Sequence, residues 1–216
     1  MLTSHTNVLR TDMMNTVSIC VFLAGIILII ILSNSTNISL ASQNSTVSNI
    51  FTYINSTFGI KMQIPSDWDL QEVGDMLKKS TVTIIRLTPA FDIHKSFDTD
   101  PSDGNTYVDI NLQKNNRNMS LDTLMKNNIS TIKNDNNTSD FKLLYSTTGA
   151  NLAGRKAYTM VYTSTNNGLE TITMDSAALC GNRIYSATFN AEPSSYAELA
   201  QTVQKMIGSL RLTTMS

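Results

Sequence analysis

The chain has 216 residues, with 16 basic and 17 acidic side chains and a net charge of −1. Nucleic-acid-binding proteins gather positive charge on one surface, so this balance and the lack of a basic cluster exclude that class of partner. Of the two cysteines, Cys20 lies in an apolar segment and Cys180 is alone in the rest of the chain. We therefore expect a domain that folds on its hydrophobic core without an internal disulfide.

Near its start the chain has an uncharged apolar run, Val17–Leu32, which follows a short polar segment, 1–16. As a helix the run would extend about 24 Å, slightly less than the ~30 Å hydrocarbon core of a bilayer. It fits either a signal peptide, cleaved near Ala41 in the small-x-small triplet Ser39-Leu40-Ala41, or a transmembrane anchor over 17–33. The long spacing from Leu32 to Ala41 favours the anchor. We predict a domain outside the cytoplasm, either held by a single membrane pass or secreted.

Residues 34–49 are rich in Ser, Thr and Asn and carry no charge, which is typical of a flexible stalk. Asn-x-Ser/Thr triplets, the acceptors of N-linked glycans, occur only after the apolar run. This one-sided distribution predicts a glycoprotein. The candidate glycosylation sites are Asn34, Asn37, Asn44, Asn55, Asn118, Asn128, Asn136 and Asn137.

The folded domain is predicted over residues 50–213 and opens with strands. Apolar residues alternate with polar or small residues in the segment 58–65, the period-two pattern of a half-buried strand. A Ser56-Thr57 turn separates this segment from a strand at 51–55, and we place Trp68 in the turn that follows it. Further strands are expected at 82–87 and 107–113, the second with one polar face.

A helix is expected next, followed by a run of hairpins. Ser120 is the predicted N-cap, Asp122 and Lys126 form an i, i+4 pair, and the segment 134–140 is predicted to be a loop. Four strands follow at 141–145, 156–163, 169–179 and 183–190, with glycine-containing turns at Asn167-Gly168 and Gly181-Asn182.

The chain ends in a second predicted helix, for which Ser195 and Glu198 form a capping box. Its apolar stripe is expected to pack on one face of the sheet and consists of Tyr196, Leu199, Val203, Met206, Ile207 and Leu210. Together these elements predict an α+β fold with a central antiparallel sheet.

Three segments of the domain resemble the PsbP-like family of extracytoplasmic proteins. They are YINSTFGIKMQIPSDW (53–68), NLAGRKAYTMVYT (151–163) and the closing hairpin and helix at 181–210. The resemblance covers about residues 50–213. It implies a central antiparallel sheet flanked by helices, an α/β/α sandwich that serves as a binding or assembly module without catalysis. Calcium association is also attributed to this family.

An acidic segment between two predicted strands, Asp92–Asp109, is the candidate metal site. Within it Asp98, Asp100 and Asp103 precede Gly104, and carboxylate oxygens are the ligands that Ca²⁺ prefers. The spacing does not match an EF-hand, and Pro101 interrupts it. An ordinary acidic loop is the favoured interpretation, with Ca²⁺ as the alternative.

Catalysis finds little support in the sequence. His94 is the only histidine after the apolar run, so a multi-histidine metal site is excluded. It could pair with Asp92 to orient Ser96, but neither a nucleophile elbow nor a recognisable triad is present. Cys180 is expected to be a half-buried structural thiol.

Aromatic residues leave one further alternative open. Tyr158, Met160 and Tyr162 share one strand face, which could be core or an exposed strip for a partner. The leading prediction is a non-catalytic module, tethered to or secreted across the membrane, that binds an envelope or membrane protein. A Ca²⁺-dependent sensor or assembly factor and a divergent hydrolase are the alternatives.

Overall fold

The computed structural model describes residues 49–73, 81–90, 106–115, 118–166 and 168–213. All of them belong to one compact unit, Val47–Ser216. The apolar run, most of the stalk and the acidic segment 91–105 lie outside the described residues. In the described part of the chain, no helix is both long and apolar enough to cross a membrane.

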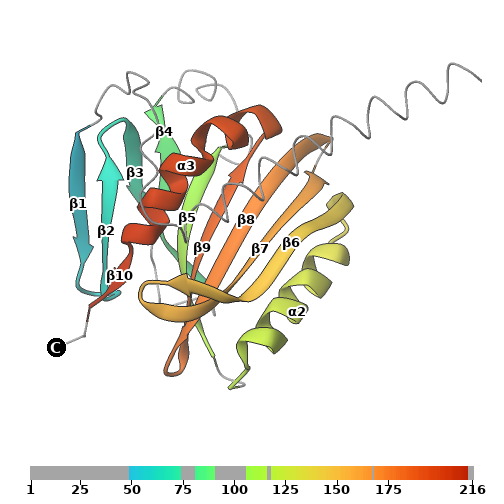
Figure 1. Ribbon diagram of the computed structural model, residues 1–216, viewed down its shortest axis with the longest axis horizontal. Helices are drawn as coiled ribbons and strands as arrows, with labels where there is room; N and C mark the ends of the chain where they lie inside the picture. Colours follow the sequence, from blue (N-terminus) through green and yellow to red (C-terminus); the bar gives the residue numbers. More distant parts are fainter. Residues whose placement is uncertain (1–48, 74–80, 91–105, 116–117, 167, 214–216) are drawn as a thin grey trace, which may run out of the picture. The chain divides into compact units, whose positions relative to one another are not determined.

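Ten strands and two helices make up the described unit (Figure 1). The strands are β1 Ile50–Asn55, β2 Ile60–Pro65, β3 Trp68–Glu72, β4 Thr81–Pro89, β5 Tyr107–Lys114, β6 Thr138–Leu152, β7 Arg155–Asn166, β8 Leu169–Cys180, β9 Arg183–Ala191 and β10 Arg211–Leu212. The helices are α2 Leu121–Lys133 and α3 Pro193–Ser209.

The strands form two antiparallel sheets. The larger has seven strands in the order β3-β4-β5-β9-β8-β7-β6, and the smaller has three in the order β1-β2-β10. Strands β6 to β9 form the predicted meander, and β9 then pairs with β5. Gly168 and Gly181 have φ values of 84° and 60° in the two hairpin turns, a backbone region that glycine adopts without strain.

Helix α3 packs on one face of the large sheet and against β2 (Figure 1). All six residues of its predicted apolar stripe are buried. Tyr196 stacks on Phe189 of β9, with ring centroids 4.9 Å apart. The main core therefore lies between α3, the small sheet and this face of the large sheet.

Helix α2 packs against β6, β7 and β8 on the opposite face, where a smaller core forms around Leu124, Tyr158 and Met160. The predicted cap is confirmed, since the Ser120 side chain accepts a hydrogen bond from the Thr123 amide. The predicted Asp122–Lys126 ion pair is confirmed at 2.8 Å.

The prediction of a central antiparallel sheet with helices packed on it is confirmed. The described unit is mainly β, however, because its two helices have only 13 and 17 residues and each packs on part of the seven-stranded sheet. Within the described residues the helices do not complete an α/β/α sandwich. The small second sheet, which β10 completes by pairing with β2, was not predicted.

Three local predictions are wrong. Trp68 opens β3 and pairs with Pro89, because long-range pairing begins directly after the turn at Ser66 and Asp67. Helix α3 starts at Pro193, whose fixed φ suits the first helical position; its N-cap is Glu192, which makes no side-chain capping bond. The predicted loop 134–140 ends early, since Thr138 already pairs with Asn166 in β6.

Candidate functional site

The two faces of the large sheet differ in chemistry. On the face toward α3, strands β5, β8 and β9 carry mostly apolar side chains, which are buried except near the strand ends. The alternate positions, on the face toward α2, carry Asp, Asn, Ser, Thr and Tyr side chains over most of their length. The predicted polar face of β5 is thus part of a larger polar surface. It includes Tyr107, Asp109, Asn111, Thr171, Thr173, Asp175, Ser186, Thr188 and Asn190.

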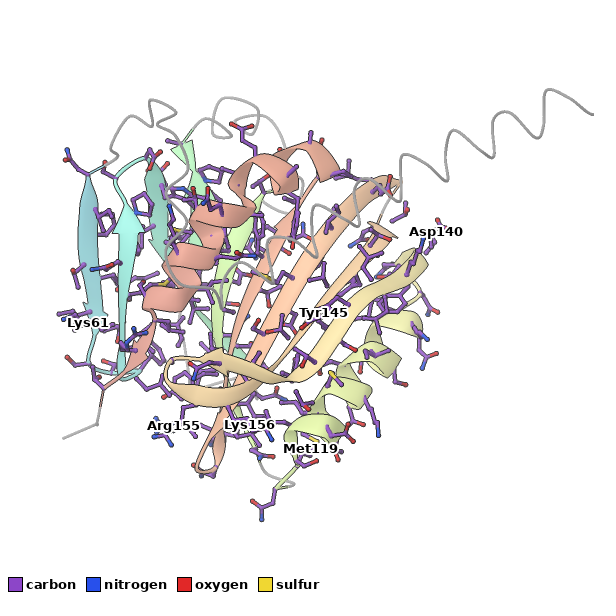
Figure 2. All side chains as sticks on the ribbon, viewed as in Figure 1. Lys61, Met119, Asp140, Tyr145, Arg155 and Lys156 are labelled. Atoms are coloured by element: carbon purple, nitrogen blue, oxygen red, sulfur yellow. The ribbon has the colours of Figure 1, made fainter. Side chains whose placement is uncertain are left out.

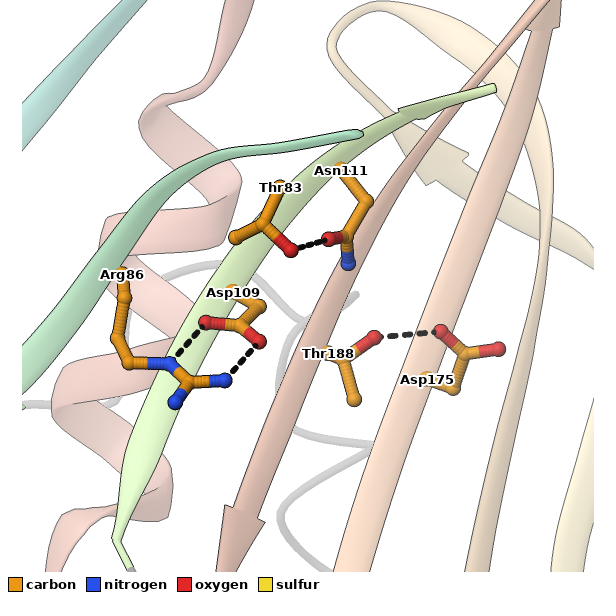
Figure 3. Close-up of polar contacts among 6 residues, drawn as sticks. All are labelled: Thr83, Arg86, Asp109, Asn111, Asp175 and Thr188. Carbon is orange, nitrogen blue, oxygen red and sulfur yellow. Dashed lines mark hydrogen bonds and ion pairs between the residues drawn. The ribbon is translucent and has the colours of Figure 1, made fainter. Parts of the chain in front are cut away.

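Cross-strand pairs organise this surface in rows (Figure 3). On β4 and β5, the Arg86 guanidinium donates from Nε and Nη2 to the two Asp109 carboxylate oxygens, at 2.9 and 2.8 Å. One strand further, Thr188 lies opposite both Asp109 and Asp175. Arg86 is thus held in a two-point geometry by one neighbouring strand, which fixes its direction.

Asp175 is the most buried charged group of the polar face, with 7% of its surface exposed. The Tyr158 hydroxyl donates to its Oδ2 at 2.6 Å and the Thr188 hydroxyl donates to its Oδ1 at 3.0 Å. The Tyr158 oxygen in turn accepts from the Asn128 side-chain amide of α2, at 2.6 Å. Burial raises the pKa of Asp175 above its ordinary value, and the hydrogen bonds from Tyr158 and Thr188 oppose that shift.

Tyr107, at the start of β5, lies under the Arg86 guanidinium, which is 4.4 Å from the ring centroid. Burial raises the pKa of its hydroxyl, and the Asp109 carboxylate adds to the shift. Tyr162 on β7 stacks obliquely with Phe141, with centroids 5.3 Å apart, and burial raises its pKa to about 12. Both phenols are therefore neutral hydrogen-bonding groups at physiological pH.

Between these tyrosines and the C-terminal end of α2 lies a cleft of about 470 Å³. That volume is within the range of small-molecule binding sites. Its lining residues come from β5, β6, β7, β8, β9 and the end of α2, and most carry hydroxyl or amide groups. They are Tyr107, Thr131, Ile132, Asp135, Thr138, Tyr162, Ser164, Asn166, Leu169, Thr171, Thr173, Thr188 and Asn190.

The structure separates two residues that the sequence grouped with Tyr162. Tyr158 and Met160 are buried beneath α2, whereas Tyr162 is only partly buried and lines the cleft. The two interpretations of this strand face therefore apply to different parts of the same strand: core under the helix, and cleft beyond its end.

The predicted metal ligands Asp98, Asp100 and Asp103 lie outside the described residues, so the calcium site stays a prediction. Asp109, at the end of that acidic segment, is described, and both its oxygens accept hydrogen bonds from Arg86. Within the described ranges, no group of three or more His, Cys, Asp or Glu residues could hold a metal ion.

Four of the predicted glycosylation sites in the described part are on or near the surface at ends or turns. Asn118, Asn136 and Asn137 are exposed, and Asn55 is half-buried at the end of β1. The fifth, Asn128, is half-buried on α2 and donates its side-chain amide to Tyr158. Asn34, Asn37 and Asn44 lie outside the described residues, and none of the eight sites is tested by these contacts.

The structure does not test the His94, Asp92 and Ser96 arrangement weighed for catalysis. All three residues lie outside the described part of the chain, which includes no histidine. Cys180 is half-buried at the end of β8 and packs against the main core. Trp68 is buried in that core, with 4% exposure.

The fold and this cleft define a class of protein: a small antiparallel domain that presents a fixed polar surface on one sheet face. The chain belongs to the PsbP-like family, whose model, described as PsbP-like protein, matches residues 16–212. The resemblance seen in the sequence is therefore confirmed. No curated protein matches the chain.

Solved structures similar to this chain have low sequence identity to it. The cyanobacterial PsbP (CyanoP) of Synechocystis sp. PCC 6803 has 9% identity and a TM-score of 0.54, over 80% of this chain and 98% of that one. The Ran-binding protein Mog1p of Saccharomyces cerevisiae has 10% identity and a TM-score of 0.48, over 76% and 96%. LpqN, involved in cell envelope biogenesis of Mycobacterium tuberculosis, has 11% identity and a TM-score of 0.44, over 79% and 88%.

Proposed function

We propose that the protein is a non-catalytic binding or assembly module that works outside the cytoplasm and holds its partner in the polar cleft. The observation that carries this proposal is the cleft itself, which lies on paired strands of one sheet. Sites built on strands and helices hold their side chains more precisely than sites on loops. Membership of the PsbP-like family supports a role in binding or assembly.

The hydrogen bonds of the polar face support binding over catalysis. Thr188 and Asp175 are the described pair that most resembles a nucleophile and a base, but Asp175 also accepts from Tyr158 and thereby links β7 to β8. Asp175 is also not among the residues that line the cleft. A broad esterase and peptidase screen of the purified protein should show no turnover.

The place of action rests on the chain before the domain. The apolar run at 17–33 supports a membrane tether, and the glycosylation triplets after it support exposure of the domain outside the cytoplasm. The proposed partner is accordingly an envelope or membrane protein, or a component attached to one. The near-neutral charge of the chain argues against nucleic acid.

Partner capture from native membranes tests the proposal. Thr131→Arg and Asn166→Arg place a bulky charge at exposed positions on the rim of the cleft. Gln201→Arg makes the same change of charge at an exposed position on α3, which packs on the opposite sheet face. We expect both rim variants to lose a partner that wild type and Gln201→Arg retain. Equal recovery by all four proteins would contradict the proposal.

Calcium binding by Asp98, Asp100 and Asp103 is the alternative proposal, supported by the acidic composition of their segment. Calorimetric titration of the full chain with Ca²⁺ should then give heat that the double variant Asp98→Ala/Asp100→Ala loses. A titration without heat removes this alternative and leaves the cleft proposal unaffected.

A further inference from the structure

The floor of the cleft is a row of side chains across four neighbouring strands. Tyr107 of β5 pairs with Asn190 of β9, Asn190 pairs with Thr173 of β8, and Thr173 pairs with Tyr162 of β7. With neighbouring strands about 4.8 Å apart, the two tyrosine positions are roughly 14 Å apart. The row thus places an amide and a hydroxyl between two aromatic residues, and the Thr173 hydroxyl donates to the Asn190 side-chain oxygen at 2.8 Å.

A second cross-strand row also carries hydroxyl groups and lies nearer the β7–β8 turn. Ser164 of β7 pairs with Thr171 of β8, and both line the cleft. Thr131 and Thr138 add hydroxyls from the end of α2 and the start of β6. The hydroxyls of Thr171 and Thr173 donate within the protein, but each hydroxyl oxygen of the lining can still accept, so the cleft suits a ligand with neutral hydrogen-bonding groups.

Charge is scarce in the cleft. Asp135 is the only charged residue of the lining and it is exposed, with one oxygen accepting from the Asn137 amide. The nearby Arg86 is held by Asp109. The basic residues Arg155 and Lys156 lie at the far end of the β6–β7 hairpin, whereas the cleft is at the end where Thr138 pairs with Asn166 (Figure 2). None of the lining residues is basic, and Lys133, in the last turn of α2, has its ammonium 5.5 Å from the centroid of the Phe141 ring.

The aromatic residues at the two ends of the row are fixed in place by their neighbours. The guanidinium of Arg86 covers Tyr107, and Phe141 packs on Tyr162. A tyrosine ring offers an apolar face together with one polar edge. Ligands that have both C–H faces and hydroxyl edges match that combination.

We propose that this cleft binds a neutral saccharide, with the sugar rings against Tyr107 and Tyr162 and their hydroxyls on the Thr, Ser and Asn side chains of the floor. The inference rests on the proposed binding function and names its ligand class. A pyranose ring carries hydroxyls around its edge and C–H groups on its faces, which is the pattern the cleft complements. The hydroxyls of Thr173 and Thr188 already donate within the protein, but their oxygens can still accept, and an apolar ligand would displace water from them without replacing its hydrogen bonds, at a cost in affinity.

Ligand-detected saturation-transfer NMR tests the inference on the full, unglycosylated chain in lipid nanodiscs. Glycoside detergents must be absent, because their sugar head groups would compete. The probes are the trisaccharides of N-acetylglucosamine, β-linked glucose and α-linked glucose, and trigalacturonate is the anionic comparison. We expect transfer to ring C–H protons of at least one neutral probe, and weaker transfer to trigalacturonate.

Variants localise the binding. Tyr107→Leu should raise the dissociation constant of the bound neutral probe about tenfold. Tyr107→Phe should leave this constant unchanged, because the ring supplies most of the contact. Tyr145→Leu, at a half-buried tyrosine of β6 outside the lining, is the matched control and should bind like wild type. Asn166→Arg changes an exposed residue on the rim of the cleft and should also weaken binding, so the test does not depend on the stability of the Tyr107 variants.

The outcomes are separable from those of the proposed function. No transfer to any neutral trisaccharide, or equal affinity in wild type, Tyr107→Leu and Asn166→Arg, would overturn the saccharide inference. Loss of partner capture in the rim variants together with absent saccharide binding would overturn the inference alone. If saccharide binding is absent and the rim variants capture the partner as wild type does, both the saccharide inference and the proposed function fail.

Discussion

Replacing Tyr158 by phenylalanine removes one hydroxyl oxygen from the interior without a change in ring size. That oxygen is fully buried, donates to Asp175 and accepts from Asn128, with both distances at 2.6 Å. The carboxylate loses a donor that water cannot replace, which costs about 1–3 kcal/mol. The half-buried Asn128 amide can turn to water, which adds about 1 kcal/mol. We expect Tyr158→Phe to lower the free energy of unfolding by about 2–4 kcal/mol.

The loss should depend on pH because it involves the ionisation of Asp175. Burial raises the folded-state pKa of this carboxyl, so folding takes up a proton and stability falls as the pH rises from the unfolded pKa through the folded pKa. The Tyr158 hydrogen bond opposes the rise. Without it the folded pKa rises further, and stability declines over a wider pH interval, by at most about 1.4 kcal/mol per pH unit. Tyr158→Phe should therefore cost more at about pH 8 than at about pH 5.

Thermal unfolding followed through Trp68 fluorescence measures this effect, because Trp68 is the only tryptophan and is buried in the described domain. A loss of 2–4 kcal/mol corresponds to a fall in Tm of roughly 4–16 °C for a domain of this size. Tyr145→Phe, at a half-buried tyrosine of β6, is the control and should change stability by less than about 0.5 kcal/mol. Equal stability of wild type and Tyr158→Phe at both pH values would refute the reasoning.

Three further predictions test other contacts. Arg86→Lys keeps the charge but loses the two-point contact with Asp109. It should lower the free energy of unfolding by about 1 kcal/mol, since the Arg86 side chain is 31% exposed; no loss would show that the geometry is unimportant. Phe189→Ala removes a fully buried ring and should cost about 3–5 kcal/mol, whereas a cost below about 1 kcal/mol would contradict the described core. Intact-glycopeptide mass spectrometry should find glycan at the exposed Asn137 and none at Asn128, because the Asn128 side-chain amide donates to the buried Tyr158 hydroxyl. Glycan at Asn128 would contradict this contact.

The sequence predicts the regular parts of this fold because the local pattern and the long-range pairing agree there. Strand β5 alternates cleanly, and β8 and β9 are bounded by glycine turns with positive φ. Strand β6 is different, since its register shifts three times against β7. Each shift breaks the period of two, and only the segment 141–145 was predicted as a strand. The two-residue strand β10 carries too little pattern to be predicted, and it forms through its pairing with β2.

The site was less accessible to sequence reasoning for a physical reason. Its residues come from five strands and one helix end, and the pairing that aligns Tyr107, Asn190, Thr173 and Tyr162 is not encoded in any one segment. The available signal was the alternation of polar residues, seen in β5, which also recurs in β8 and β9. Recognising the cleft from it would have required the strand order of the sheet in addition.

Site-specific photocrosslinking in native membranes tests the central claim most directly, namely that the polar cleft is the binding surface. A benzoyl-phenylalanine would replace Asn166 on the rim of the cleft or Gln201 on α3, both exposed. The account predicts a light-dependent adduct of defined mass from position 166 and none of that mass from position 201. Adducts of the same mass from both positions, or from position 201 alone, would contradict it.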